Sequence, residues 1–353
     1  MQPDRFLPVE VVFMPAWWHK HYGLRFDQAF YLDKDTRLRN DQTMNQALRE
    51  RFGGMGLGEN GPAPRPIIGS RHVAGGFVMP ALMGCQIEFN PDIAPGVLHA
   101  NLSDEQVLAL EVPDVANTWP MNVLLAQMDE LQAEFGAVVG DFDLDGVLNL
   151  AFSLRGQQIF LDFQENPALA RRLLDVCARA MLAVAELVKP RTGTVAVATN
   201  RMITHVDPAM FLHSNCTVQM ISPRAYEAFL LAPELYLAQH LTPFGIHHCG
   251  VNMHLYLEHY ARVPSIYYDV GWGSDVAACR RALPEPFFSL RLSPVRMLNA
   301  TPAEIAADVE GLLRNCPNLE RAGVCAINLD ARTPDANVWS MFEVIQRYRR
   351  YGA

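Results

Sequence analysis

The sequence predicts an α/β protein, a single (β/α)8 barrel with an N-terminal helical extension. Short apolar runs alternate with helical patterns beyond Pro66, and this alternation is typical of a parallel sheet covered by helices. The chain has 353 residues, which is enough for a barrel and an extension. An open, doubly wound sheet would give a similar pattern. No second domain boundary is visible after Pro66, and this favours the barrel.

We expect residues 1–65 to form the extension and residues 66–353 to form the catalytic barrel, as one domain overall. Asp33–Phe52 has a helical pattern with few apolar positions, which predicts a surface helix. The Gly/Pro-rich segment Gly53–Arg65 predicts a loop. It contains Gly56-Leu57-Gly58-Glu59-Asn60-Gly61, the GxGxxG spacing of dinucleotide-binding turns. Such a turn needs a strand before it and a helix after it, whereas here a helix precedes it, so we favour a plain loop.

Beyond the loop, strands and helices are predicted in turn. Six apolar runs predict buried strands: Ala137–Gly140, Thr194–Thr199, Phe244–Cys249, Ser265–Val270, Phe287–Leu292 and Gly323–Leu329. Further strands are expected near His72–Phe89 and Phe211–Cys216. Helices are predicted at Met121–Phe135, Pro167–Val188, Pro223–His240, Asp275–Leu283, Pro302–Arg314 and Pro334–Tyr348. Ser222-Pro223 and Thr301-Pro302 each combine an N-cap hydroxyl with a proline in the first turn, a typical helix start.

Composition excludes several classes of partner. The formal net charge is -9 and no basic block is present, so we expect no nucleic-acid partner. No apolar run reaches the roughly 18 to 20 residues of a membrane span, and the N-terminus lacks the pattern of a signal peptide. The seven cysteines are odd in number and irregularly spaced, which indicates a reducing compartment rather than a disulfide framework. We therefore expect a cytoplasmic protein.

The segment Asp141-Phe142-Asp143-Leu144-Asp145-Gly146 begins like a calcium-binding loop. Such a loop needs a glutamate at its twelfth position, where this chain has Phe152. We therefore interpret it as a strand end that leads into a polar loop. At the active face of a barrel, a carboxylate in this loop could meet a substrate.

A candidate metal site lies at the end of the strand that begins at Phe244. Side chains two residues apart on a strand point the same way, so His247 and Cys249 could bind one metal while His248 faces away. Imidazole with thiolate suits zinc or a similar cation. Cys325, in the late strand Gly323–Leu329, is the candidate third ligand. A hydrogen-bonded core histidine with a buried thiol is the alternative interpretation.

These residues resemble a motif of the uroporphyrinogen decarboxylase superfamily, and within it of the zinc-dependent corrinoid methyltransferases. The resemblance rests on His247-x-Cys249-Gly250, on Gly323-Val324-Cys325-Ala326 and on Thr333-Pro334-x-x-Asn337. Further matching stretches are Leu154-Arg155-Gly156, Ile221-Ser222-Pro223-Arg224-Ala225-Tyr226 and Ala300-Thr301-Pro302-Ala303-Glu304-Ile305. The similarity runs from about residue 35 to the C-terminus and implies a (β/α)8 barrel.

The resemblance implies a zinc-dependent methyltransferase that moves a methyl group between a corrinoid (cobalamin) and a thiol or methyl-ether type substrate. The chain carries no corrinoid domain, so the corrinoid would be bound to a separate partner protein. The identity of the methyl donor or acceptor and the direction of transfer stay open, and a homodimer is one option. The segment Pro15–Gly23 lacks the arginine pair with which the decarboxylases grip porphyrinogen carboxylates. A metal-free decarboxylase-like lyase and a non-catalytic corrinoid-protein-binding barrel are the alternatives.

Further residues are candidates for catalysis and substrate binding. Asp269 closes the strand Ser265–Val270 and could be a displaceable fourth ligand or a base beside the zinc; a helix N-cap or ion pair is the alternative. Trp18, His21 and Tyr22 belong to an aromatic cluster that suits a planar substrate or a corrin edge, unless it simply packs on the barrel. Arg291 could bind a carboxylate or the corrinoid phosphate, or form a structural ion pair. Asn215 and Cys216, at the end of another predicted strand, are expected to point towards the barrel mouth. Asn337 is expected either to line the pocket beside the last strand or to cap the final helix.

Overall fold

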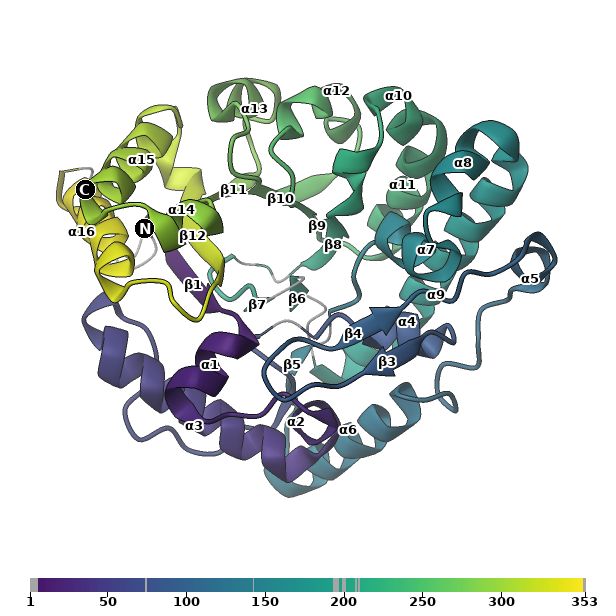
Figure 1. The fold of residues 1–353 in the computed structure, drawn as a ribbon, viewed down its shortest axis with the longest axis horizontal. Helices are drawn as coiled ribbons and strands as arrows, with labels where there is room; N and C mark the ends of the chain where they lie inside the picture. Colours follow the sequence, from purple (N-terminus) through teal and green to yellow (C-terminus); the bar gives the residue numbers. More distant parts are fainter. Residues whose placement is uncertain are drawn as a thin grey trace.

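A curled parallel sheet forms the centre of the fold. The computed structural model describes residues 6–351, except 74, 142, 193–196, 199, 200, 207 and 209. Six parallel strands pair in the order β1-β12-β11-β10-β9-β8. Their bounds are β1 (Val9–Phe13), β8 (Phe211–Asn215), β9 (Phe244–His248), β10 (Ser265–Val270), β11 (Phe287–Arg291) and β12 (Ala322–Leu329). Figure 1 shows this sheet curled inside a ring of helices, which confirms the predicted barrel-like α/β fold.

A second parallel pair, β2 (Ile67–Gly69) and β5 (Val139–Asp141), adds two strands to this architecture. β1 lies within residues 1–65, the segment expected to be an extension, yet it pairs with β12 from Val9 to Phe13. The N-terminal segment therefore contributes a strand to the central sheet, in addition to helices that pack outside it. The reason is its apolar sequence, since Val11, Val12 and Phe13 are buried.

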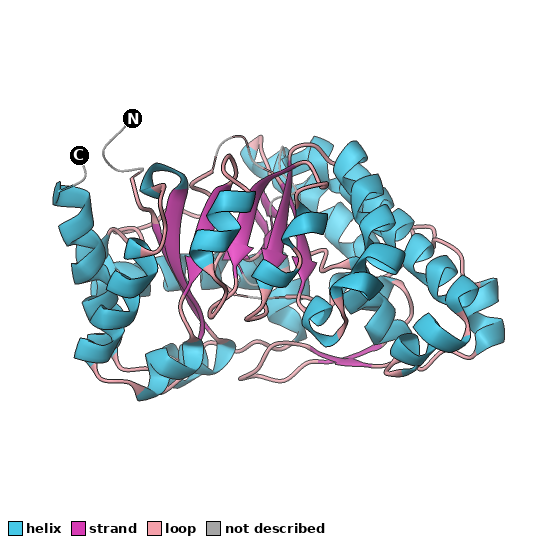
Figure 2. Ribbon diagram, turned by 90° about the horizontal axis from the view of Figure 1, so that it is seen from above, coloured by secondary structure: helices cyan, strands magenta, loops and turns pink. Residues whose placement is uncertain are grey.

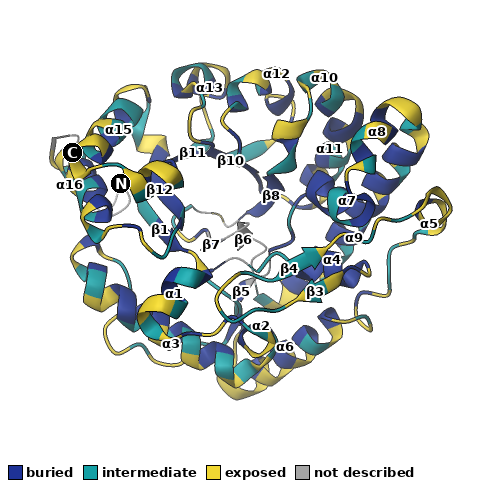
Figure 3. Cartoon of the chain, viewed as in Figure 1, coloured by how far each residue is buried: buried dark blue, intermediate teal, exposed yellow. Residues whose placement is uncertain are grey.

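Helices cover the outer face of the sheet. The longer ones are α3 (Lys34–Phe52), α6 (Met121–Phe135), α7 (Val147–Arg155), α8 (Gln158–Glu165), α9 (Pro167–Thr192), α11 (Leu231–His240), α15 (Pro302–Arg314) and α16 (Asp335–Tyr351). Shorter ones are α1 (Pro15–Tyr22), α2 (Gln28–Leu32), α4 (Val78–Leu82), α5 (Asp104–Ala109), α10 (Pro223–Ala225), α12 (Leu257–Tyr260), α13 (Val276–Ala282) and α14 (Pro294–Asn299). Their inward faces are buried and their outward faces exposed (Figure 3). Figure 2 shows the strands enclosed between helices.

Most predicted elements are present with small shifts at their ends. The predicted strand Ser265–Val270 is β10, and the predicted helices Met121–Phe135 and Pro302–Arg314 are α6 and α15. The predicted helix Pro223–His240 is interrupted, because α10 and α11 are joined by a π-helical turn at Tyr226–Leu230. The predicted strand Thr194–Thr199 lies partly outside the described residues.

The two faces of the sheet differ in chemistry because strand side chains alternate. On β11, Phe288 and Leu290 join the main apolar core under the helices, whereas Ser289 and Arg291 point into the curled sheet. On β10, Tyr268 joins that core and Asp269 faces the interior. Buried polar side chains therefore collect inside the barrel. No helix in the described part of the chain is long and apolar enough to cross a membrane.

Two small antiparallel hairpins lie outside the parallel sheet. β3 (Gln86–Glu88) pairs with β4 (Gly96–Leu98), and this is the strand found within the predicted region His72–Phe89. β6 (Val197–Ala198) pairs with β7 (Arg201–Met202). In Figure 1, β6 and β7 lie in the centre of the ring of strands and helices. The second hairpin is thus placed to reach the polar interior of the barrel.

Candidate metal centre

Three side chains meet where two adjacent strands end. Cys216 follows β8 directly, and His247 and Cys249 come from the end of β9. One ligand atom of each residue, two sulfurs and one imidazole nitrogen, lies within 4.8 Å of the others. Among the histidine, cysteine, aspartate and glutamate side chains of the described residues, these three form the one group close enough together to hold a metal ion. The chemistry of the group, two thiols and an imidazole, fits zinc.

Strand pairing explains why these residues converge. Asn215 on β8 is in register with His248 on β9, and both side chains reach the hydroxyl of Tyr260 on the outer face of the sheet. Because side chains alternate along a strand, the residues next to them, Cys216 and His247, turn to the opposite face. Cys249 lies two residues beyond His247 and shares its direction. His248 faces away from the group, as the sequence predicted.

The third member of this group differs from the expected one. The sequence analysis paired His247 and Cys249 with Cys325, and the structure instead brings Cys216 to them. Cys325 is fully buried on β12, three strands from β9, where it packs with Val12 and Ile327. Cys216 was expected from the sequence to point towards the barrel mouth together with Asn215, but it was not expected to be a ligand. Alternation along β8 separates the two residues, since the one after the outward-facing Asn215 must face the interior.

Asp269 is the hydrogen-bond partner of His247 rather than a member of the ligand group. Its Oδ2 lies 2.5 Å from Nδ1 of His247, which leaves Nε2 as the nitrogen that can face a metal. Asp269 also accepts hydrogen bonds from Arg201 at both oxygens, at 2.8 and 3.2 Å, and from the Tyr267 hydroxyl. These contacts use both carboxylate oxygens, so the geometry favours an orienting role over ligation.

Charge inside the barrel sets the protonation of this pair. Burial acts to raise the pKa of Asp269, but the charge of Arg201 and the hydrogen bond with His247 hold that pKa well below its usual range. Burial also acts to lower the pKa of His247, and the hydrogen bonds with Asp269 and Cys249 reverse this and raise it. The carboxylate is therefore charged, and it binds the proton on Nδ1 of the ring.

The two thiols of the group share a hydrogen bond and divide the charge between them. This bond lowers the pKa of Cys249 against the opposing effect of burial, and the neighbouring His247 lowers it further. The same bond and burial raise the pKa of Cys216. Without a metal, Cys249 is thus the thiolate and Cys216 the thiol that donates to it. Such a pair needs to lose one proton to become two thiolate ligands.

Arg291 brings positive charge to this side of the barrel. Its Nη1 donates to the backbone carbonyl of Cys249 at 3.3 Å, and its side chain is buried. Burial acts to lower its pKa, but the neighbouring thiols of Cys249 and Cys325 raise it. Its buried Nε has no partner among the described residues. The expected role of Arg291, binding of a carboxylate or of the corrinoid phosphate, stays a prediction.

Two carboxylates of the loop after β5 also face this region. Burial raises the pKa of Asp143 to about 6. Burial and the neighbouring charge of Asp143 raise the pKa of Asp145 to about 8. The charge of His247 acts to lower both pKa values. Asp145 accepts a 2.6 Å hydrogen bond from Asn149, whereas the buried Oδ2 of Asp143 has no partner among the described atoms. The loop thus supplies carboxyl groups near His247. The expectation that one of them meets a substrate stays a prediction.

The two asparagines predicted to bind substrate both form hydrogen bonds within the protein. The amide of Asn215 donates to Glu234 at 2.9 Å on the outer face of the sheet, away from the interior. The amide of Asn337 donates to the carbonyls of Met297 and Ala300, which secures the end of α14. The side-chain nitrogens of both residues are thus used within the protein, whereas the buried Oδ1 of Asn337 has no partner among the described atoms. A substrate-binding role for either residue stays a prediction.

The aromatic residues of α1 mainly pack the helix onto the barrel. Trp18 is buried, and its ring lies 4.9 Å from that of Trp17 and 5.9 Å from that of Tyr22. His21 is exposed and its Nε2 lies 3.3 Å from the carbonyl of Ala331. This arrangement corresponds to the packing interpretation of the cluster. A substrate-binding role for Trp18, His21 and Tyr22 stays a prediction.

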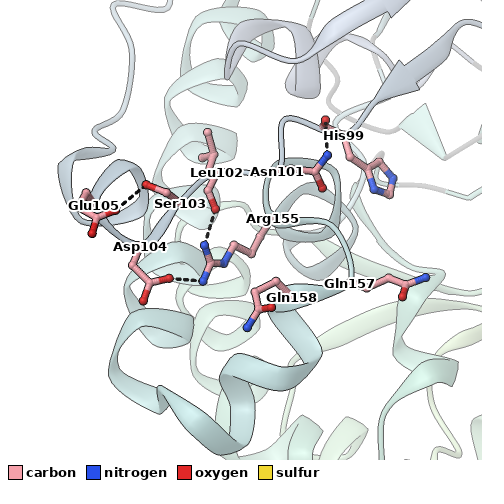
Figure 4. Close-up of a pocket in the computed structure, with 9 residues that line it drawn as sticks. All are labelled: His99, Asn101, Leu102, Ser103, Asp104, Glu105, Arg155, Gln157 and Gln158. Carbon is pink, nitrogen blue, oxygen red and sulfur yellow. Dashed lines mark hydrogen bonds and ion pairs between the residues drawn. The ribbon is translucent and has the colours of Figure 1, made fainter.

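A surface pocket away from the candidate metal centre holds Arg155, part of a motif noted in the sequence (Figure 4). Residues of the β4–α5 segment and of the α7–α8 connection line it, among them His99, Asn101, Asp104 and Gln158. Arg155 donates to Asp104, to the carbonyl of Leu102 and to Asp162. Its positive charge is therefore neutralised within the protein, and Arg155 joins α7 to its neighbours rather than offering a site.

Comparisons with known proteins agree with this architecture. The uroporphyrinogen decarboxylase (URO-D) family matches residues 74–348, most of the chain, and the protein therefore belongs to this family. Among solved structures, it is similar to a methyltransferase from Methanosarcina mazei, with a TM-score of 0.68 and 15% identity over 97% of this chain and 94% of that one.

A second similar structure is a B12-independent methionine synthase from Shewanella sp. W3-18-1 in complex with selenomethionine. Its TM-score is 0.50 and its identity 9%, over 98% of this chain and 99% of that one. At such identities the likeness concerns the fold alone. The comparison with curated proteins gives no match.

Proposed function

We propose that this protein is a zinc-dependent methyltransferase that moves a methyl group between a corrinoid on a partner protein and a thiol or methyl-ether type substrate. The observation that carries the proposal is the convergence of Cys216, His247 and Cys249 within 4.8 Å at the ends of β8 and β9. The ends of barrel strands are where catalytic residues lie in this fold. The similar fold of a methyltransferase supports the reaction class.

The donor set favours zinc over harder cations. Two thiolates and a neutral imidazole suit zinc, and three protein ligands leave one position of a tetrahedral site for a substrate. Asp269 would orient the imidazole through Nδ1, the arrangement by which carboxylates support zinc-bound histidines. In this proposal Cys216 takes the place that the sequence analysis assigned to Cys325.

Zinc, when bound, would act as a Lewis acid on the sulfur or oxygen that accepts or carries the methyl group. The chain's own groups have separate tasks around it. Arg291 offsets the charge of two thiolates, since its guanidinium lies beside Cys249. Asp143 and Asp145, with their raised pKa values, could hold or release a proton near His247. A substrate thiol that binds at the open position must lose its proton. Asp143, with a pKa of about 6, is mostly ionised at neutral pH and is the nearby acceptor, whereas Asp145, with a pKa of about 8, holds its own proton.

The loops that follow the barrel strands support docking of a partner protein. Large apolar side chains are exposed after β8, β9, β10 and β11: Met220, Val251, Leu255, Trp272 and Val295. Exposed apolar residues that gather on one face are typical of binding surfaces. Their position around the candidate metal centre suits a partner that presents its corrinoid to the barrel mouth.

Porphyrinogen decarboxylation has less support from the residues near α1. A substrate with several carboxylates needs a set of unpaired cations. The basic residues in this stretch are Lys20 and two histidines, and Lys20 and His21 contact the carbonyl of Ala331. Arg51 nearby is held by both oxygens of Asp335. These residues do not form a free cationic clamp.

The first test is the metal content of the purified protein and of three cysteine variants. We expect about one zinc per chain in the wild type, retained in Cys325→Ser and lost or strongly weakened in Cys216→Ser and Cys249→Ser. Cys325→Ser is the matched control, because it removes another thiol of the barrel interior that lies outside the group of three. A fully folded wild type without bound zinc would contradict the proposal, and zinc loss in Cys325→Ser alone would restore the ligand set expected from the sequence.

The second test follows the chemistry. The absorbance of cob(I)alamin and methylcobalamin is recorded with a panel of thiols and methyl ethers in the presence of the protein. We expect conversion between the two forms with at least one substrate, and at least a hundred-fold slower conversion in Cys249→Ser. Turnover that survives the Cys216→Ser and Cys249→Ser double change would favour a metal-free mechanism.

A further inference from the structure

The β6–β7 hairpin places one arginine inside the barrel. Arg201 lies on β7 and its side chain is 2% exposed. Its guanidinium contacts Glu10 on β1, Tyr267 and Asp269 on β10, and Ser289 on β11. A residue from outside the parallel sheet therefore links three of the strands from within.

The contacts of Arg201 fix the plane of the Asp269 carboxylate. Its Nη2 donates to Oδ1 of Asp269 at 2.8 Å and its Nη1 lies 3.2 Å from Oδ2, the two-point geometry that only arginine provides. The same Oδ2 lies 2.5 Å from Nδ1 of His247. A continuous chain of charged hydrogen bonds thus runs from β7 through Asp269 to the imidazole of the candidate metal centre.

The charges of this chain depend on Arg201. The side chain of Asp269 is 0% exposed and that of Glu10 is 13% exposed, and Arg201 donates to both. Two carboxylates buried this close together require a cation between them. A second cation, Arg291, acts on Asp269 from a distance but is placed beside Cys249. Arg201 is therefore the cation that keeps a charged acceptor in place for the Nδ1 proton of His247.

We propose that Arg201 is a positioning residue of the metal centre, which holds Asp269 so that Nε2 of His247 faces Cys216 and Cys249. The inference rests on the proposed function for the identity of the site, because it assumes that this face of the imidazole binds a metal. It also assigns a role to the β6–β7 hairpin, which supplies this arginine to the interior of the sheet.

The experiment uses the full-length protein with two measurements, one that needs no metal. In metal-free protein, the ¹⁵N and ¹H NMR signals of the His247 imidazole report which nitrogen holds the proton and whether it is hydrogen-bonded. Competition with a chromophoric chelator reports the zinc dissociation constant. The variants are Arg201→Met, Arg201→Lys and the control Arg37→Met. Arg37 is equally buried and bonds to Ile67, Tyr31 and Gln127, none of them in the candidate metal centre.

We expect Arg201→Met to lose the hydrogen-bonded Nδ1 proton signal and to weaken zinc binding by about 10- to 100-fold, the usual effect of removing a residue that supports a ligand. Arg201→Lys should recover part of both, since it restores the charge but not the two-point contact. Arg37→Met should leave both unchanged even where it lowers the melting temperature. If Arg201→Met does not fold, the double variant Arg201→Met with Glu10→Gln removes one of the two buried carboxylates and is measured instead.

The outcomes separate this inference from the proposed function. A folded Arg201 variant with an unchanged His247 signal and unchanged zinc affinity overturns the positioning role. A wild type that binds no zinc, but whose His247 signal depends on Arg201, supports the positioning role and rejects the zinc enzyme. Equal losses in the Arg37→Met control would show that the effect is general destabilisation, and would overturn the inference.

Discussion

At the scale of residues, two cysteines of the barrel interior differ in the pKa of their thiols. Cys249 is partly exposed and its pKa is lowered by the hydrogen bond from Cys216 and by His247. Cys325 is fully buried, and burial raises its pKa to about 12. The thiolate is the reactive form of cysteine. We therefore expect the thiol of Cys249, at the end of β9, to react with electrophiles and that of Cys325, three strands away, to be inert.

This difference predicts the pH dependence of alkylation in metal-free protein. Because its pKa is lowered, Cys249 should still react with iodoacetamide at pH 6, where an ordinary thiol is largely protonated. Cys325 in the same chain should stay unmodified. Mass spectrometry of peptides after timed alkylation measures both, and added zinc should protect Cys249. Reaction of Cys249 only above pH 8 would contradict the prediction.

At the scale of elements, a buried carboxylate joins the sheet to its outer helices. Glu234 on α11 accepts hydrogen bonds from Asn215 at the end of β8 and from Tyr226 in the π-helical turn, at 2.9 and 2.5 Å. His213 lies 3.8 Å from the same carboxylate. Tyr226 is the first residue of the π-helical turn that joins α10 to α11. This network, rather than a ligand, explains why the side chain of Asn215 turns outwards.

Glu234 should make the stability of the protein fall as pH rises. Burial raises its pKa to about 7, against about 4.3 in an unfolded chain. Between these values the folded state holds a proton that the unfolded state has lost, so the unfolding free energy falls by at most roughly 1.4 kcal/mol per pH unit. Glu234→Gln mimics the protonated form and should remove this slope.

The measurement is urea unfolding of wild type and Glu234→Gln at several values between pH 5 and pH 8. The difference between the two proteins isolates Glu234 from neighbours such as His213, whose lowered pKa acts in the opposite sense. We expect the variant to gain stability relative to wild type with increasing pH. A difference that is constant over this range would show that Glu234 stays ionised in the folded state.

At the scale of the whole molecule, the candidate metal centre and several exposed apolar residues lie at the same end of the barrel, where the parallel strands end. Apolar residues such as Trp272, in a turn after β10, and Val295, in α14 after β11, are exposed in the segments that follow strands, on the side where Cys216 and Cys249 lie. Such an arrangement leaves a face that another protein can cover without disturbing the core. The proposed partner surface and the candidate metal centre thus share one end of the barrel.

Trp272→Glu should therefore impair transfer with a protein-bound corrinoid and spare transfer with free methylcobalamin. The charge would disfavour burial of this surface against a partner, and we expect at least a ten-fold rise in the apparent KM for the corrinoid protein. Leu161→Glu, on the outer helix α8 (Figure 1), is the matched control because Leu161 is also an exposed apolar residue. Equal effects in both variants, or none in Trp272→Glu, would argue against docking at the barrel mouth.

The sequence by itself determined the barrel class, most strands and helices, and the pairing of His247 with Cys249. These follow from local rules, since alternation and helical periodicity are properties of short segments. The resemblance to the family rested on the same local motifs, and the family match bears it out.

Only the tertiary structure decided which distant residues complete the group. Cys216 and Cys325 both face the barrel interior, but strand order places Cys216 beside His247 and Cys325 three strands away. Likewise Arg201 reaches Asp269 from a hairpin 68 positions earlier in the chain. The physical reason is that ligation and ion pairing require atoms within a few ångströms. The order and curling of the strands set such distances, and no local pattern in the sequence records them.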